Sequence, residues 1–375
     1  MTQLRRSPLR TRRTYALAAA ILALLPMTVT ANGIGTVFVV SPAQGTATIF
    51  ERITQSVVGV ANVAEQPHAV AFSPDTMKGY VTSSGSGNIA VIDRELYETA
   101  SRIPTSGNPL HVSVAPTGQR LYYTDANVAA LGVVDLVDNN ALKPIPMDAP
   151  GHGVAVSPDD RRVYVTVPSS DVMLGFDPGT GQIAARISVG GGATHLAYSP
   201  DGAWLYVLRP EAGTIEVVDP RVDRLAASIS IGSGLGDVAF SSDGLQAYVA
   251  GPGPSQVTVL DAVAHRVVNR VAVPSGGPAT GIAADDQSVY VAVPAENRVY
   301  VLQRTSMQVV RELQVTGATT VTTVPDPFIL RVVPHELPNT GSGESAALYR
   351  WLMVIGIVLL AASAAFRSRW SASSI

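Results

Sequence analysis

Tyrosine recurs at a fixed interval of 42 residues through most of this 375-residue chain. The positions that share the interval are Tyr80, Tyr122, Tyr164, Tyr206, Tyr248 and Tyr290, with Phe38 one interval earlier. Half of the twelve tyrosines therefore follow a single period, which random placement does not produce. A repeat of about 40 to 45 residues that contains four short strands is typical of a β-propeller. Seven positions on this period predict seven blades.

Residues 191–231 show the repeated unit most clearly. Four apolar or β-branched runs, at 195–198, 204–208, 215–218 and 225–231, are separated by segments that contain Pro, Asp and Gly. Such runs predict strands, and the segments between them predict turns, because proline presets a turn dihedral and glycine accepts positive φ. The sequence therefore predicts an all-β fold built from four-stranded blades.

The first unit lacks its inner strand. Runs at 36–40, 46–50 and 57–63 supply three strands, and the missing one is found near the other end of the chain, at 317–323. If the N- and C-terminal strands share one blade, the ring closes without a free sheet edge. We assign residues 32–333 to the seven-bladed propeller, with the run at 328–333 as an extra strand or an exit segment.

Two units carry a recognisable motif. Residues 70–75 read Val-Ala-Phe-Ser-Pro-Asp and 154–159 read Val-Ala-Val-Ser-Pro-Asp, and each is followed by Tyr-Val-Thr, at 80–82 and 164–166. These units resemble the YVTN-type β-propeller repeats over about residues 33–333. The pattern departs at Ser83 and Val167, where that family has Asn. The resemblance implies the same propeller fold.

The N-terminus has the pattern of an export signal. Residues 1–13 contain five arginines and no acid, 15–25 are almost purely apolar, and Val29-Thr30-Ala31 offers small residues for cleavage. This order is typical of a secretory signal peptide, assigned here to residues 1–31. The apolar run is short for a retained membrane anchor. Arg12-Arg13 leaves twin-arginine export open beside the general secretory route.

The C-terminus carries a second processing pattern. Leu337-Pro338-Asn339-Thr340-Gly341 precedes a polar spacer, an uncharged apolar run at 351–366, and Arg367 and Arg369. This order resembles an LPXTG sortase sorting signal. The resemblance implies that sortase cuts after Thr340 and joins it to the peptidoglycan.

We therefore divide the C-terminus into a linker with the pentapeptide at 334–341, and a spacer, transmembrane helix and basic tail at 342–375. Residues 351–366 would hold the chain in the membrane before processing, with the basic tail kept inside. The predicted location is extracellular and anchored to the cell wall. The alternative is a single-pass membrane protein with the propeller outside, in which the pentapeptide has no role.

Charge and cysteine content exclude several functions. Residues 32–340 carry 18 basic and 28 acidic groups, which disfavours nucleic acid as a partner. The chain has no cysteine, which excludes disulfides, thiolate metal sites and a cysteine nucleophile. The sequence also lacks a Gly-x-Ser-x-Gly elbow and a phosphate-binding loop.

Four of the six histidines stand at the starts of adjacent inner strands: His68, His111, His152 and His195. Counted from the following turn, two are six residues before its proline and two are five before it. A one-residue offset turns a strand side chain to the opposite face, so we expect the imidazoles not to converge and to hydrogen-bond neighbouring turns instead. The regularly spaced aspartates are expected to accept hydrogen bonds from turn amides.

The sequence therefore predicts no catalytic, metal or cofactor residues on the propeller. The expected function is a non-enzymatic, surface-displayed module that binds an unknown protein or glycan. The alternative is a propeller enzyme at the cell surface, similar to lactonase-type hydrolases or cofactor-binding oxidoreductases. An enzyme needs charged or imidazole groups that converge at the ring axis, and three or more at one mouth would favour it.

Overall fold

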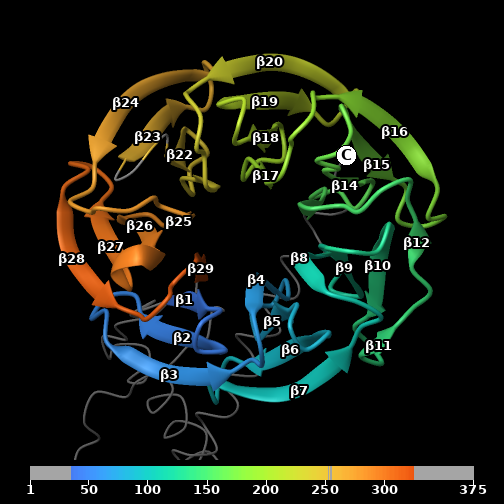
Figure 1. The fold of residues 1–375 in the computed structure, drawn as a ribbon, viewed down its shortest axis with the longest axis horizontal. Coiled ribbons are helices and arrows are strands. Elements are labelled where there is room, and N and C mark those ends of the chain that lie inside the picture. The colour runs from blue at the N-terminus through green and yellow to red at the C-terminus, as the bar shows by residue number, and fades with distance from the viewer. Residues whose placement is uncertain (1–34, 252, 254–255, 325–375) are drawn as a thin grey trace, which may run out of the picture. The chain divides into compact units, whose positions relative to one another are not determined.

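The structure of the protein, a computed structural model, describes residues 35–251, 253 and 256–324. These residues form seven antiparallel sheets arranged as a ring around a central channel (Figure 1). Six consecutive units of the repeat each fold into one sheet, one of them with its outer strand split in two, and the seventh sheet combines strands from both ends of the described chain. The prediction of an all-β, seven-bladed propeller is confirmed.

One blade joins the two ends of the described chain. Its inner strand is β29 (Thr320–Val324), followed outward by β1 (Thr36–Ser41), β2 (Thr46–Glu51) and β3 (Val57–Asn62). Thr322 pairs with Phe38 in an antiparallel register. The predicted closure by N- and C-terminal strands is therefore confirmed, and the closing strand begins three residues later than the sequence indicated.

The other six blades follow in chain order, each from its inner to its outer strand. The first two are β4 (Pro67–Phe72), β5 (Lys78–Ser83), β6 (Asn88–Asp93) and β7 (Glu98–Pro104), then β8 (Pro109–Val114), β9 (Arg120–Asp125) and β10 (Ala130–Asp135) with the short β11 (Asn140–Ala141) and β12 (Ile145–Pro146). The next two are β13 (Val154–Val156), β14 (Val163–Val165), β15 (Val172–Phe176) and β16 (Ile183–Ser188), then β17 (Leu196–Tyr198), β18 (Leu205–Arg209), β19 (Thr214–Asp219) and β20 (Arg224–Ser230). The last two are β21 (Val238–Phe240), β22 (Gln246–Ala250), β23 (Gln256–Asp261) and β24 (Arg266–Ala272), then β25 (Gly281–Ala284), β26 (Ser288–Val293), the 3₁₀ turn η1 (Pro294–Glu296), β27 (Arg298–Gln303) and β28 (Val309–Gln314).

The hydrophobic core lies between neighbouring blades. All six periodic tyrosines and Phe38 are among the largest fully buried side chains. Tyr122 of one blade, for example, belongs to the same buried cluster as Val163 and Phe176 of the next. The 42-residue period thus marks the side chain that each blade inserts against its neighbour, and its burial supplies much of the hydrophobic stabilisation.

The periodic aspartates stabilise turns, as predicted. Asp177 accepts hydrogen bonds from the backbone N–H groups of Gly179 and Thr180, at 2.9 and 2.8 Å. Acceptance from the amides two and three residues on also occurs at Asp93, Asp135 and Asp261. A carboxylate that accepts from local amides fixes the turn, which accounts for the recurrence of aspartate at these positions.

Both processing signals lie outside the described residues. This applies to the predicted signal peptide at 1–31, to the strand or exit segment at 328–333, to the pentapeptide at 337–341 and to the apolar run at 351–366. Among the residues that the structure does describe, no helix is long and apolar enough to cross a membrane.

Candidate functional site

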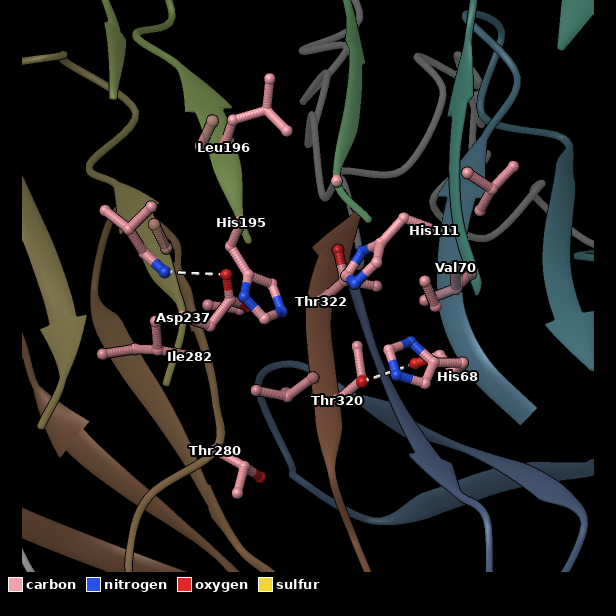
Figure 2. Close-up of a pocket in the computed structure, with 18 of the residues that line it drawn as sticks. His68, Val70, His111, His195, Leu196, Asp237, Thr280, Ile282, Thr320 and Thr322 are labelled. Atoms are coloured by element: carbon pink, nitrogen blue, oxygen red, sulfur yellow. Dashed lines mark hydrogen bonds between the residues drawn. The ribbon is translucent and has the colours of Figure 1, made fainter. Parts of the chain in front are cut away.

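The inner strands of the seven blades enclose a cavity of about 370 Å³. Small apolar residues such as Ala69, Ala197 and Ala283 form part of its wall. The polar groups that line it include His68, His111, His195, Asp237, Thr280 and Thr320. Figure 2 shows the imidazoles of His68, His111 and His195 and the carboxylate of Asp237 around this cavity.

Each complete blade begins its inner strand with a bulge. In the fourth sheet, the N–H of His152 donates to the carbonyl of Thr166, while the N–H of Thr166 donates to the carbonyl of Gly153. Two residues of the inner strand therefore oppose one residue of its neighbour, which is the defining geometry of a β-bulge. The pairing of β4 with β5 and of β8 with β9 shifts register at the equivalent place.

The bulge brings the four histidines together. His68 and His152 occupy its first position, and His111 and His195 occupy its second. Because two residues share one place in the ladder, the strict alternation of faces is lost there, and a side chain from either position can turn into the channel. The ring centres of adjacent imidazoles lie 4.8 to 5.1 Å apart.

The expectation that the imidazoles would not converge is therefore wrong. It assumed a regular strand, whereas the strand entry contains one extra residue. The expectation that they hydrogen-bond neighbouring turns holds for His152, which bonds the backbone of Thr194 at the next strand entry, but one ring nitrogen of three imidazoles stays unpaired. Nδ1 of His68, Nδ1 of His152 and Nε2 of His111 are buried without a hydrogen-bond partner among the described residues. Only Nδ1 of His195 has a side-chain partner, the Thr194 hydroxyl at 3.1 Å.

The position of the four imidazoles keeps them uncharged. Burial, aided by the nearby His152, lowers the pKa of His68 to about 4. Burial, aided by His152 and His68, lowers the pKa of His195 to about 3. Burial also places the pKa of His111 well below its usual value, and it lowers the pKa of His152 although a hydrogen bond to the Thr194 backbone opposes the change. Neutral imidazoles present unprotonated nitrogens, which are donors for a metal ion or for a hydrogen-bonding ligand.

Asp237 is the acidic group of the cavity, and its environment is unusual. Burial raises the pKa of this carboxyl from 3.8 to about 7, although the backbone amides of Val238 and Ile282 oppose the change. The N–H of Val238 donates to its Oδ1 at 2.8 Å. A carboxyl that titrates near neutrality can exchange a proton with a bound ligand.

Asp237 was not predicted from the sequence, although the repeat marks its position. Asp237 stands 42 residues after His195, and His195 stands 84 residues after His111. All three therefore occupy the second position of the bulge in their blades, facing the channel.

Threonines from neighbouring blades hold the bulges in place. The hydroxyls of Thr124, Thr166 and Thr320 donate to the backbone carbonyls of His152, Thr194 and His68, respectively, and each bond crosses from one blade to the next. The two longer of these bonds measure 2.6 and 2.7 Å. At these three bulges, the backbone is therefore fixed by a hydrogen bond from the preceding blade, which favours a preorganised site.

These features define a seven-bladed propeller whose central cavity has three imidazoles and one carboxyl in its wall, with the ring of His152 packed against the imidazoles. A sequence model of the YNCE-like beta-propeller family matches residues 27–289, and the chain belongs to that family. A search of curated proteins finds no sequence match.

Solved structures share the fold at low sequence identity. The periplasmic gluconolactonase PpgL of Pseudomonas aeruginosa is 19% identical with a TM-score of 0.66, and the match covers 78% of this chain and 99% of that one. Hydrazine synthase of Kuenenia stuttgartiensis is 20% identical with a TM-score of 0.64, covering 70% and 90%. A functionally unknown protein of Desulfotomaculum acetoxidans is 15% identical with a TM-score of 0.68, covering 78% and 99%. Identities this low establish the common fold alone.

Proposed function

We propose that this chain is an exported propeller that is displayed on the cell wall and binds a small ligand in its central cavity. The observation that carries the choice of site is the cluster of His68, His111, His152 and His195, three of which line the cavity. Three of the four have a buried ring nitrogen without a hydrogen-bond partner among the described residues, which is costly unless a ligand satisfies it. A volume of about 370 Å³ admits a small molecule or an ion and not a folded partner.

The proposal of display depends on the termini. The leader at 1–31 supports export, and the pentapeptide at 337–341 with the apolar run at 351–366 supports attachment by sortase through Thr340. The channel would then face the extracellular medium, from which its ligand would come. A non-enzymatic binding role needs no group beyond those that line the cavity.

The second candidate is a propeller enzyme, and Asp237 is the observation that favours it. Its pKa of about 7 suits a general acid or base. One solved structure of the same fold is described as a gluconolactonase, and another, from Bacteroides uniformis, as a putative 6-phosphogluconolactonase. A lactonase-like hydrolase is therefore the reaction class to assay first, with Asp237→Asn as the variant that should abolish it.

Display can be tested by expressing the full chain in a host that has sortase and analysing its wall fraction by mass spectrometry. We expect a mature C-terminus at Thr340 that carries a wall fragment. Thr340→Ala should abolish this product, whereas Asn339→Ala, at the variable position of the motif, should retain it. Intact protein that keeps residues 351–375 in the membrane fraction would refute sortase attachment and indicate a plain membrane anchor.

A further inference from the structure

We propose that His111, His152 and His195, with His68 beside them, bind one divalent transition-metal ion, Cu²⁺ or Zn²⁺, at the centre of the propeller. The inference deepens the proposed function, because it gives the chemical class of the ligand for the same cavity. It depends on the cavity being a binding site and is independent of display on the cell wall.

The spacing of three of the rings fits a metal ion. The ring centres of His111, His152 and His195 form a nearly equilateral triangle with sides of 4.8, 4.8 and 5.1 Å. A metal–nitrogen distance of about 2.0–2.1 Å places each ring centre about 3.2 Å from the ion, so three rings at tetrahedral angles lie about 5.2 Å apart. The observed triangle is therefore already that of a three-histidine site.

The ligand nitrogens need only a small movement. One nitrogen from each of the three rings lies within 4.8 Å of the other two. In a tetrahedral site the separation is about 3.4 Å, so each nitrogen would move inward by roughly 0.8 Å. Rotation of the imidazoles about χ2 achieves this without moving the strands, since that torsion has a broad energy profile.

His68 lies next to the triangle and not within it. Its ring centre is 4.9 Å from that of His111 and 6.3 Å from that of His152. We assign His68 as the group nearest to the fourth coordination position. That position is therefore taken by His68 or stays open to a water molecule or a ligand in the cavity, as in catalytic metal sites with three protein ligands.

The donor set selects the kind of metal. All the candidate ligand atoms are imidazole nitrogens, and the grouped residues include no carboxylate. Ca²⁺ and Mg²⁺ require oxygen ligands, whereas imidazole suits Cu²⁺ and Zn²⁺. The chain has no cysteine that could redirect the site toward thiolate chemistry.

Two independent features support occupancy. Nδ1 of His152 and Nε2 of His111 are buried and have no partner among the described residues, so each has a lone pair that nothing in the protein satisfies. The Thr194 hydroxyl lies 3.1 Å from Nδ1 of His195. An outer partner of this kind fixes the tautomer and orientation of a metal-binding imidazole, leaving Nε2 for the ion.

The test is metal binding to the untagged full chain, stripped with a chelator and measured by equilibrium dialysis against Cu²⁺ and Zn²⁺, with Mg²⁺ and Ca²⁺ as controls. We expect one Cu²⁺ or Zn²⁺ per chain, no binding of Mg²⁺ or Ca²⁺, and a higher midpoint of thermal unfolding with the metal. The electron paramagnetic resonance spectrum of the Cu²⁺ form should show three or four nitrogen ligands.

Matched variants locate the site. His152→Ala should weaken binding by at least about 100-fold and His68→Ala by about 10-fold. His265→Ala removes an imidazole that packs against Trp204, with ring centres 4.7 Å apart, and should leave binding unchanged. Thermal unfolding in chelator verifies that each variant is folded, and the nitrogen count in the spectrum gives a second measurement if one variant is not.

The outcomes separate the two proposals. Failure of the wild-type chain to bind either metal, or binding that survives His152→Ala together with His195→Ala, would overturn the metal site. A chain that carries a wall fragment on Thr340 but binds no metal would leave display intact. A chain that binds metal but stays in the membrane would leave the metal site intact and refute sortase attachment.

Discussion

Replacing Asp237 by Asn should stabilise the protein at neutral and alkaline pH. Asn keeps the size of the side chain and retains an oxygen that can accept from the N–H of Val238, which lies 2.8 Å from Oδ1 in the wild type. It removes a charge that the cavity disfavours. The other titratable groups that line the cavity are His68, His111 and His195, whose pKa values are all lowered, so no cation there holds Asp237 ionised.

The sign and size of this stability change follow from the pKa of Asp237. The folded protein raises the pKa of Asp237 from 3.8 to about 7. Between these values the folded state binds more protons than the unfolded state, so stability falls as pH rises through this window and levels off above it. Each pKa unit corresponds to ~1.4 kcal/mol, so the full difference is worth about 4 kcal/mol. Asp237 is only partly buried, and solvent screening at such a group reduces the expected effect to about 2 kcal/mol.

The assay is urea unfolding of wild type and Asp237→Asn at intervals from pH 4 to 8, in chelator so that bound metal does not contribute. We expect the two free energies of unfolding to be similar near pH 4 and the variant to exceed the wild type by about 2 kcal/mol at pH 8.

A control with the opposite sign comes from Asp201, whose pKa is lowered chiefly by its hydrogen bond from Ser199. Asp201→Asn should therefore be less stable than wild type at neutral pH, and the difference should shrink as the pH falls through the acid range. If Asp237→Asn is as stable as wild type at pH 8, or less stable, the buried carboxyl is not disfavoured and the argument fails.

Two further predictions concern packing and a buried polar contact. Gly132→Ala should lower the free energy of unfolding by about 1–3 kcal/mol, because a Cβ there would meet the ring of Tyr123 at 2.1 Å. Adding Tyr123→Val, which recreates the Val81 and Ala90 pair of the preceding blade, should recover most of the loss in the same urea assay, and no recovery would contradict the packing argument. Tyr164→Phe should cost about 1.5–3 kcal/mol, because the buried hydroxyl donates to the carboxylate of Asp223. In an Asp223→Asn background the same change should cost less, and an equal cost would show that the carboxylate is not what the hydroxyl stabilises.

The fold could be predicted well from the sequence because the 42-residue period follows the positions that are buried between blades. A side chain such as Tyr206 must fill the same space between blades in every repeat, so the residue type and its position recur together. The closing strand was predictable for a related reason. The first unit had a strand too few, and an open propeller would leave an unpaired edge that only a distant segment could cover.

The site was not predictable from the same reasoning. Alternation of faces holds in a regular strand, and it correctly separates the residues at 46–49 of β2, where Ala47 and Ile49 are buried and Thr46 and Thr48 are only partly buried. It fails at the strand entry, where the backbone hydrogen bonds show two residues opposite one. A bulge has no sequence signature as strong as a tyrosine repeat. The histidines lie six or five residues before the proline of the following turn because they occupy two adjacent positions of the bulge, and both positions can face the channel.

Closure of the ring and formation of the site are physically linked. The hydroxyl of Thr320, in the closing strand, donates at 2.7 Å to the carbonyl of His68, 252 residues away in sequence. The remaining imidazoles belong to three further blades, so no local segment can assemble the group by itself. The entropy lost in bringing such distant segments together is part of the free energy of folding, and the imidazoles meet only in the closed ring. A ligand that binds all of them therefore binds the closed state alone, and its binding free energy adds directly to the stability of the ring.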